Sequence, residues 1–103
     1  MYRVSVIYGT PTDPSEFDEY YRNVHIPLAK KMQSLTRWTL TWTQDQNGEL
    51  SEDVYLVADL YAESKEAMDA ILASPEGQAA AADVAKFATG GATMIFGEEE
   101  VVL

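Results

Sequence analysis

The sequence predicts a single domain of the α+β class, and three observations support this expectation. Four segments alternate polar and apolar side chains with the period of two that is typical of strands, at about residues 2–8, 35–44, 54–61 and 92–96. Two regions repeat apolar residues every three or four positions, which is typical of amphipathic helices, at about residues 13–31 and 64–87. The chain of 103 residues has no linker, repeat or low-complexity tract, so one domain over residues 1–103 is expected.

The first helix has a clear beginning and an expected interruption. Asp13 can cap it, and Pro14 suits the first helical position because an N–H there has no helical partner anyway. The apolar pattern continues to about Lys31. Pro27 lies inside this stretch, where a proline lacks an N–H and crowds the carbonyl of the preceding turn. We therefore expect a kink or a break at Pro27 that displays the neighbouring His25.

Turn and capping signals define the remaining elements. Asn47-Gly48 favours a tight turn between the second and third strands. Ser64 and Ser74 can each cap a helix, and Gly90-Gly91 separates the last helix from the last strand. The resulting order, β-α-β-β-α-β, is that of a ferredoxin-like sandwich, in which helices cover one face of a four-stranded antiparallel sheet.

The other face of such a sheet has no helices to cover it. If Val4, Val6 and Leu60 face the helices, alternation assigns seven residues to this open face: Arg3, Ser5, Ile7, Tyr55, Val57, Asp59 and Tyr61. The surface is too apolar and aromatic to remain exposed as one large patch. We expect a second copy to cover it, sheet against sheet, and so predict a homodimer. The alternative is a solvated face with scattered aromatic residues.

His25 is the only histidine and the first candidate for chemistry. It follows Tyr21 by four residues on the predicted helix, so the two side chains are neighbours on one face. An imidazole changes its charge near neutral pH, and a phenol beside it is typical of a small-molecule site. The alternative is a structural histidine that is half-buried and makes one hydrogen bond.

Composition excludes several classes of protein. The absence of cysteine excludes disulfides, thiolate chemistry and iron–sulfur ligation, and it fits a cytoplasmic protein. A net charge of −10 disfavours binding to nucleic acid or to an anionic membrane surface. No apolar run approaches the roughly 18 residues of a membrane span, and the N-terminus lacks a signal-peptide pattern.

Motifs for cofactors and metals are also missing. No glycine-rich nucleotide loop is present, and one histidine cannot supply a two-histidine metal motif. We therefore expect no metal and no cofactor, and no nicotinamide-dependent reaction. A haem bound through His25 remains an alternative, because a haem needs only one protein ligand.

Six short motifs spread over nearly the whole chain carry a family resemblance. They are Val6-Ile7-Tyr8-Gly9, Phe17 with Tyr20-Tyr21, His25-Ile26-Pro27-Leu28-Ala29, Ser74-Pro75-Glu76-Gly77-Gln78, Asp83 with Phe87, and Ile95-Phe96-Gly97-Glu98. Together they resemble the EthD family, within the dimeric α/β-barrel superfamily. The resemblance implies a homodimer whose two sheets form one barrel, with a small-molecule cavity in each subunit. His25 matches the histidine of the family pattern, and Tyr21 matches its second tyrosine.

The resemblance also implies a range of activities. EthD-like proteins are associated with the degradation of ethyl tert-butyl ether beside a cytochrome P450 system. Relatives in the superfamily include cofactor-independent quinone-forming monooxygenases, muconolactone isomerases and haem-degrading enzymes.

The sequence leads to one functional hypothesis and two alternatives. The hypothesis is a cofactor-independent enzyme, similar to an oxidoreductase, monooxygenase or isomerase, that acts on a small hydrophobic or aromatic metabolite. His25 is its predicted acid–base group, and Tyr21 is predicted to orient His25 or to bind a substrate oxygen. The strand pattern adds five predicted substrate-binding residues: Tyr8, Trp38, Tyr55, Asp59 and Tyr61. The alternatives are a non-catalytic binding or stress-response module for a hydrophobic ligand, and a haem-binding protein.

Overall fold

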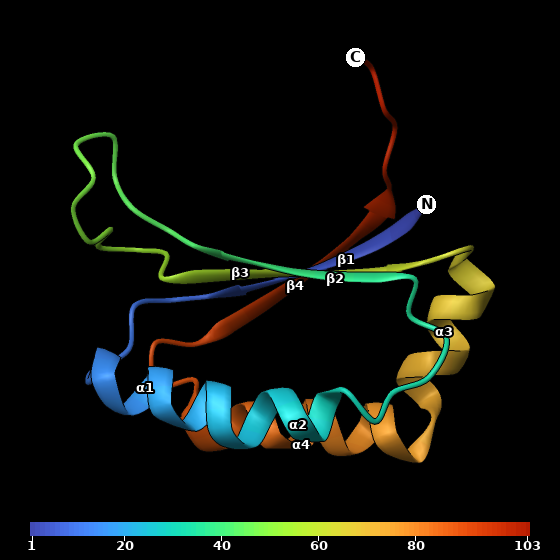
Figure 1. Ribbon diagram of the computed structural model, residues 1–103, viewed down its shortest axis with the longest axis horizontal. Helices are drawn as coiled ribbons and strands as arrows, with labels where there is room; N and C mark the ends of the chain where they lie inside the picture. The colour runs from blue at the N-terminus through green and yellow to red at the C-terminus, as the bar shows by residue number, and fades with distance from the viewer.

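Residues 1–103 form two layers in the computed structural model, a four-stranded antiparallel sheet and a layer of helices on one of its faces (Figure 1). The strands are β1 (Tyr2–Tyr8), β2 (Arg37–Trp42), β3 (Leu56–Ala62) and β4 (Ala92–Glu98). The helices are α1 (Pro14–Tyr20), the π-helical segment η1 (Tyr21–His25), α2 (Ile26–Ala29), α3 (Lys65–Ala73) and α4 (Pro75–Phe87). The strand order is β2-β3-β1-β4, and all neighbouring pairs are antiparallel. The predicted ferredoxin-like α+β fold is confirmed.

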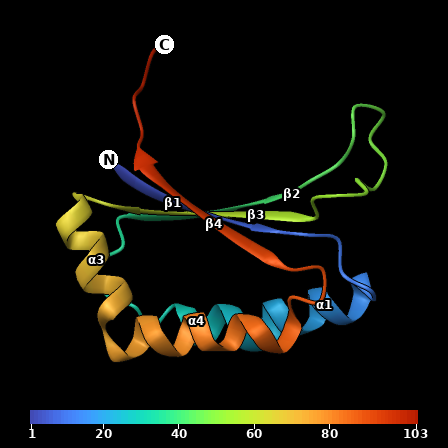
Figure 2. The ribbon, with the colours of Figure 1, turned by 180° about the vertical axis from the view of Figure 1, so that it is seen from behind.

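The helical layer is built from two long parts that lie side by side beneath the sheet. Segments α1, η1 and α2 follow one another as a single rod next to α4, and α3 connects the end of β3 with the start of α4 (Figures 1 and 2). The longest helix, α4, has 13 residues, and none of the helices combines the length and the hydropathy that crossing a membrane requires.

The predicted caps are present at three helix starts. The Asp13 carboxylate accepts a hydrogen bond from the Glu16 backbone N–H at 3.2 Å. The Ser64 and Ser74 hydroxyl oxygens accept in the same way from the backbone N–H groups of Ala67 and Gly77, each at 3.0 Å. Each cap satisfies an N–H group that would otherwise lack a partner in the first turn, so these serines and this aspartate set where the helices begin.

The expected break at Pro27 does not occur. The rod keeps helical dihedral angles through the preceding residue, where Ile26 has φ −57° and ψ −51°. The chain adjusts instead one turn earlier, where η1 widens and the Ile26 N–H donates to the carbonyl of Tyr21, five residues back. A π turn accommodates one extra residue per turn and so absorbs the irregularity that proline imposes without ending the helix. The prediction of a break was therefore wrong, and both Tyr21 and His25 in the widened turn are buried.

An aromatic cluster fills one end of the space between the two layers. Phe17 and Tyr21 stack in parallel with ring centroids 5.8 Å apart. Tyr8 from β1 and Phe87 from α4 meet Phe17 at 5.6 Å and 5.3 Å, both edge to face. Such edge-to-face contacts add to the free energy gained from burying the rings. The cluster fixes η1 against both the sheet and α4, and the residues of the candidate site extend from it.

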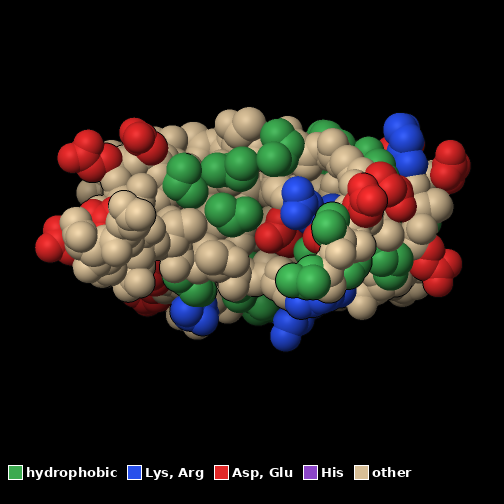
Figure 3. All heavy atoms as spheres, turned by 90° about the horizontal axis from the view of Figure 1, so that it is seen from above, with side chains coloured by type: hydrophobic (Ala, Val, Ile, Leu, Met, Phe, Trp, Pro, Cys, Tyr) green, Lys and Arg blue, Asp and Glu red, His purple; other side chains and the backbone are tan.

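The face of the sheet away from the helices is open. Figure 3 looks onto this face and shows hydrophobic side chains along its middle, with a few charged side chains among them. The loop after β2 and the C-terminal tail both rise on this side of the sheet (Figure 1). The edge strand β4 is exposed along its whole length, and Met94, Ile95 and Phe96 are 42%, 47% and 53% exposed.

Candidate functional site

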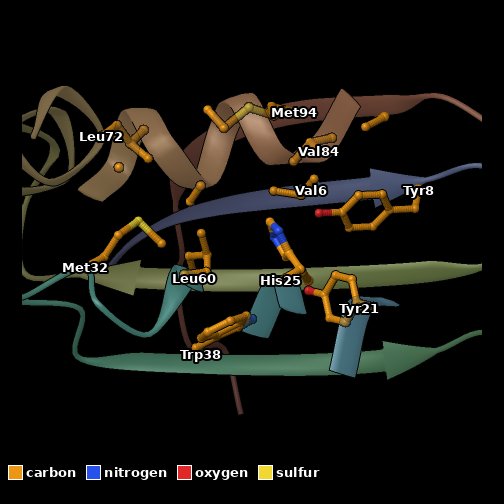
Figure 4. A pocket seen from close by; sticks show the side chains of 16 residues that line it. Val6, Tyr8, Tyr21, His25, Met32, Trp38, Leu60, Leu72, Val84 and Met94 are labelled. Carbon is orange, nitrogen blue, oxygen red and sulfur yellow. The ribbon is translucent and has the colours of Figure 1, made fainter. Parts of the chain in front are cut away.

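A cavity of about 200 Å³ lies between the sheet and the helices, next to the aromatic cluster (Figure 4). We call it the His25 cavity. Most of its walls are aliphatic or aromatic side chains, with Val6 and Leu60 from the sheet and Leu72 and Val84 from the helical layer. The exposed members of the lining, among them Met94, belong to α4 and β4, so the cavity opens between these two elements.

His25 lines this cavity, and a buried carboxylate contacts the ring nitrogen Nδ1. Its Nδ1 lies 3.0 Å from Oδ2 of Asp83 on α4, and the exposed fractions of the two side chains are 6% and 4%. The other Asp83 oxygen, Oδ1, accepts a hydrogen bond from the Tyr20 hydroxyl at 2.7 Å and lies 3.9 Å from Nζ of Lys86. Two hydrogen-bonding groups and one ammonium group, from α1, η1 and α4, thus converge on one buried carboxylate.

These contacts fix the protonation of the pair. Burial raises the pKa of Asp83, but the hydrogen bonds from Tyr20 and His25 and the charge of Lys86 outweigh it, so the pKa lies below its usual 3.8. An ionised carboxylate can only accept hydrogen bonds, so Nδ1 of His25 must carry the proton. Burial also lowers the pKa of His25 below 6.5, although the Asp83 charge opposes this change. The imidazole is therefore neutral at pH 7, with its unprotonated Nε2 left free for a ligand.

Two further polar atoms in the cavity wall lack well-formed hydrogen bonds. The indole Nε1 of Trp38 is buried and makes no hydrogen bond within the chain, and the buried Tyr21 hydroxyl has only the Tyr8 hydroxyl beside it, without a well-formed hydrogen bond. A buried polar group without a partner is costly, so two of them at one cavity point to a ligand that pairs with them. Tyr8 completes the polar part of the wall, and its hydroxyl is directed toward His25 (Figure 4). Burial raises the pKa of both Tyr8 and Tyr21, so both are neutral phenols at physiological pH.

The structure brings together four of the seven predicted site residues. His25, Tyr21, Tyr8 and Trp38 all line the cavity. Their ring contacts reflect this: the Tyr21 and His25 centroids are 5.1 Å apart, as expected for neighbours on one helical face. His25 is thus both buried and part of a cavity wall, so the structural and functional interpretations of this residue do not exclude each other.

Asp59 and Tyr61 lie outside the cavity. Both belong to the open face, where Asp59 accepts a hydrogen bond from the Ser5 hydroxyl and the Tyr61 hydroxyl donates to Glu99 at 2.9 Å. Arg3 lies 3.9 Å from Asp59 and 3.5 Å from Glu99 and joins the same network. The reason is the period of two along β3, which puts these side chains on the face opposite to the helices and to the His25 cavity.

Tyr55 lies on neither the open face nor the cavity wall. It precedes β3, so strand alternation does not apply to it, and its ring packs under the sheet 5.3 Å from that of Phe17. Its hydroxyl donates to Asp18 at 2.6 Å, and burial together with this bond raises the pKa of Tyr55 to about 12. Tyr55 instead borders a shallow hollow next to Arg22, whose guanidinium lies 4.7 Å above the ring of Trp42.

Asp83 is the one site residue for which no role was predicted from the sequence. The signal was present, because Asp83 falls between Ala80 and Phe87 on the buried stripe of an alanine-rich helix. An aspartate on an apolar stripe is rare unless it is paired. Its partner, His25, lies 58 residues earlier in the chain, and no local pattern connects the two.

The site offers little to a metal ion or a haem. No group of three or more His, Asp or Glu side chains comes together in the structure. The cavity of about 200 Å³ is only modestly larger than the roughly 150 Å³ that holds benzene in a protein core, so a macrocycle bound through His25 does not fit it.

Comparison with known proteins identifies the family. The model of the EthD domain matches residues 9–91. An uncharacterized 11.0 kDa protein from the thcB-thcC intergenic region of Rhodococcus erythropolis is 47% identical over 103 residues, which cover 100% of this chain and 99% of that protein. The crystal structure of an EthD family protein from Bacillus halodurans has a TM-score of 0.89 and 33% identity, over 97% of this chain and 99% of that one.

More distant structures share the fold alone. SnoaB, a cofactor-independent oxygenase from Streptomyces nogalater, has a TM-score of 0.61 and 15% identity over 99% of this chain and 94% of that one. A dimeric protein of unknown function from Bacteroides fragilis has a TM-score of 0.66 and 13% identity over 95% of both chains. The match over residues 9–91 and the two close relatives decide the assignment. This chain belongs to the EthD family.

Proposed function

We propose that this chain is an enzyme of the EthD type in which His25 transfers protons to and from a small hydrophobic or aromatic molecule. One observation carries the proposal: Asp83 holds Nδ1 of a neutral His25 at 3.0 Å in the wall of an apolar cavity. The arrangement is similar to that of other buried carboxylate–histidine pairs, in which the carboxylate orients the ring and stabilises the imidazolium that forms.

The reaction begins with removal of a proton. Nε2 of His25 accepts it from an O–H group or an activated C–H group of the substrate, which leaves an anion, and the Asp83 carboxylate offsets the new positive charge on the ring. Return of the proton to another atom of the substrate gives an isomerisation. In an oxygenation, the anion instead transfers an electron to molecular oxygen, the resulting radical and superoxide join through a new C–O bond, and the imidazolium returns its proton to the peroxide. The product is a hydroperoxide that contains both oxygen atoms, and loss of water from it gives a carbonyl. A protein of the same fold is described as a cofactor-independent oxygenase, which makes the second course compatible with this architecture.

Tyr21 supports His25 in this proposal. Its neutral hydroxyl is buried beside the imidazole without a well-formed hydrogen bond in the chain, so it can donate a hydrogen bond to a substrate oxygen. Such a donor stabilises negative charge where the anion develops. Tyr21 then contributes to binding and to charge stabilisation while His25 moves the proton.

We also propose that the functional unit is a homodimer formed through the open face. The support is physical: Ile7, Val57 and Ile95 belong to a sheet face that no element of this chain covers, and the edge strand β4 is exposed on both sides. A protein with a similar fold is described as dimeric. Light scattering at micromolar concentration should give twice the chain mass of 11.4 kDa, and a monomer under these conditions would remove this assignment.

The competing function is non-catalytic binding of a hydrophobic ligand. The almost entirely apolar cavity favours it, because an apolar cavity binds such a molecule whether or not a reaction follows. The two functions differ in turnover. A binding protein shifts its melting temperature with ligand and leaves the ligand unchanged, whereas an enzyme converts it.

The decisive experiment follows proton transfer directly. The ketone 2-indanone has acidic C–H groups and a size close to that of the cavity, so its incorporation of deuterium from D₂O can be followed by NMR. We expect the wild type to accelerate this exchange and His25→Gln to abolish the acceleration. Lys65→Gln, at an exposed ion pair on α3, is the matched control and should exchange at the wild-type rate. Equal exchange by wild type and His25→Gln would contradict the proposed role of His25.

A further inference from the structure

The polarity of two atoms in the wall of the His25 cavity, Nε2 of His25 and Nε1 of Trp38, defines the ligand more closely than the apolar walls do. We infer that the ligand is uncharged, presents an acidic O–H or C–H group to Nε2 of His25, and presents a carbonyl-type oxygen to Nε1 of Trp38. This rests on the proposed function in one respect, that the ligand occupies the His25 cavity.

Trp38 requires an acceptor from the ligand. An indole N–H can only donate, and Nε1 of Trp38 is buried without any acceptor in the chain. Trp38 extends from β2, and in Figure 4 its nitrogen is on the side of the ring nearer to His25 and Tyr21. A carbonyl oxygen at this position would satisfy the indole, whereas an apolar group would leave it unpaired.

His25 requires a donor from the ligand. Because Asp83 accepts the proton on Nδ1, the tautomer is fixed, and Nε2 has only an electron pair to offer. A ligand oxygen without a hydrogen would face this electron pair and be repelled. His25 therefore needs a hydrogen-bond donor from the ligand, whereas Trp38 needs an acceptor. A ligand that satisfies both carries a hydroxyl or an acidic C–H together with a carbonyl group.

The walls of the cavity disfavour charge. No Lys or Arg lines the cavity, and its only titratable members are Tyr8, Tyr21 and His25, all of them neutral at pH 7. The nearest full charge is the carboxylate of Asp83 behind the imidazole, and it repels anions. A carboxylate or phosphate on the buried part of a ligand would therefore lose its hydration without gaining a partner. A volume of about 200 Å³ accommodates about eight to ten non-hydrogen atoms, by comparison with benzene in about 150 Å³.

Five small probes separate these requirements. The test compounds are 3- and 4-hydroxyacetophenone, which carry both groups at two spacings. The controls are 4-ethylphenol, which lacks the carbonyl, methyl benzoate, which has a carbonyl but neither a hydroxyl nor an acidic C–H group, and 4-hydroxybenzoate, which is an anion at pH 7. Titration calorimetry should show the better hydroxyacetophenone binding roughly 3- to 10-fold more tightly than either neutral control, the value of one net hydrogen bond. The benzoate should bind most weakly.

Trp38→Phe isolates the acceptor site. This variant should weaken the hydroxyacetophenone to the level of 4-ethylphenol and leave 4-ethylphenol itself unchanged. Trp42→Phe is the matched control, since Trp42 lies on the same strand but outside the cavity lining. It should keep the wild-type preference.

The failures of the two ideas can be told apart. If 4-ethylphenol and the hydroxyacetophenones bind equally well and Trp38→Phe changes nothing, the inference about Trp38 is wrong while the cavity remains the ligand site. Strong binding of 4-hydroxybenzoate overturns the requirement for an uncharged ligand. If none of the neutral probes binds, the His25 cavity is not the ligand site, and the inference falls together with the proposed function.

Discussion

Nδ1 of His25 in η1 and Oδ2 of Asp83 in α4 lie 3.0 Å apart, although 58 residues separate them in the chain. This contact joins the two long parts of the helical layer at the wall of the cavity. The carboxylate is also bonded to Tyr20, so the pair is oriented from both sides. Orientation of a histidine by a buried carboxylate usually decides which ring nitrogen is available for chemistry.

Asp83→Asn should damage proton transfer more than it damages binding. An asparagine can donate to Nδ1 as well as accept from it, so the ring can adopt the tautomer with its proton on Nε2 and lose its function as a base. We expect deuterium exchange of 2-indanone to slow by roughly 10- to 1000-fold while binding of the ketone changes little. The exposed Asp69 on α3 supplies the control Asp69→Asn, for which exchange at the wild-type rate is expected. An Asp83→Asn enzyme with the full exchange rate would show that the carboxylate is only structural.

Stability should fall as the pH decreases from 7 toward 5. The pKa of His25 is lowered from 6.5 by folding, so the unfolded chain takes up a proton in a pH range where the folded chain does not, and acid favours unfolding there. The contribution of neutral His25 to the free energy of unfolding is therefore fully present above about pH 6.5 and declines as the pH falls below this value. Since His25 is the only histidine, His25→Gln should flatten this part of the curve. Melting temperatures measured at intervals of half a pH unit test this, and a slope that persists in the variant would assign it to other groups.

Tyr55→Phe should destabilise the protein, whereas Tyr21→Phe should not. The Tyr21 hydroxyl is buried without a well-formed hydrogen bond, so its removal should leave the free energy of unfolding unchanged or raise it by up to about 1 kcal/mol. The Tyr55 hydroxyl donates to Asp18, and its removal should lower that free energy by about 1 kcal/mol. Chemical denaturation of both variants provides the comparison. Destabilisation by Tyr21→Phe equal to that by Tyr55→Phe would mean that the Tyr21 hydroxyl has a partner in solution.

Ile7→Asp should convert the proposed dimer into a monomer. Ile7 points away from the helices on the central strand β1, so a carboxylate there would be buried without a partner in a sheet-to-sheet interface. Light scattering should then give the mass of one chain, and far-ultraviolet circular dichroism should show unchanged secondary structure. Val24→Asp adds the same charge at an exposed position of η1 and should leave the mass as it is in the wild type. A dimeric Ile7→Asp variant would place the interface elsewhere.

Local patterns sufficed to predict most of the fold. Period-two alternation located the four strands, and Asp13, Ser64 and Ser74 marked the helix starts because a cap depends only on residues within one turn. The pairing of Tyr21 with His25 was predictable for the same reason. These features are determined by neighbours in the sequence.

The parts that escaped prediction depend on distant contacts. Tyr55 faces the helices because its ring packs on Phe17 and its hydroxyl donates a hydrogen bond to Asp18. The alternation of residues along a strand does not predict these contacts. Asp83 acquires its importance only when α4 packs against η1. Only half of the His25–Asp83 pair could therefore be predicted from the sequence. His25 was a candidate because of its chemistry, whereas the role of Asp83 depends on the tertiary fold.

The π turn in η1 also determines which residues on either side of it face the sheet. Phe17 and Ala29 are both buried, at 3% and 2% exposure, and their separation of twelve positions would place them about 120° apart on an uninterrupted α-helix. The extra residue in η1 reduces this angle to about 20°, so both face the sheet. A family member with one residue fewer in this segment could present the same two faces from an ordinary α-helix. An alignment of such a chain with this one should therefore place a single-residue gap between Tyr21 and His25. A regular α-helical period applied to this chain without that gap would wrongly assign Ala29 to the solvent-exposed side.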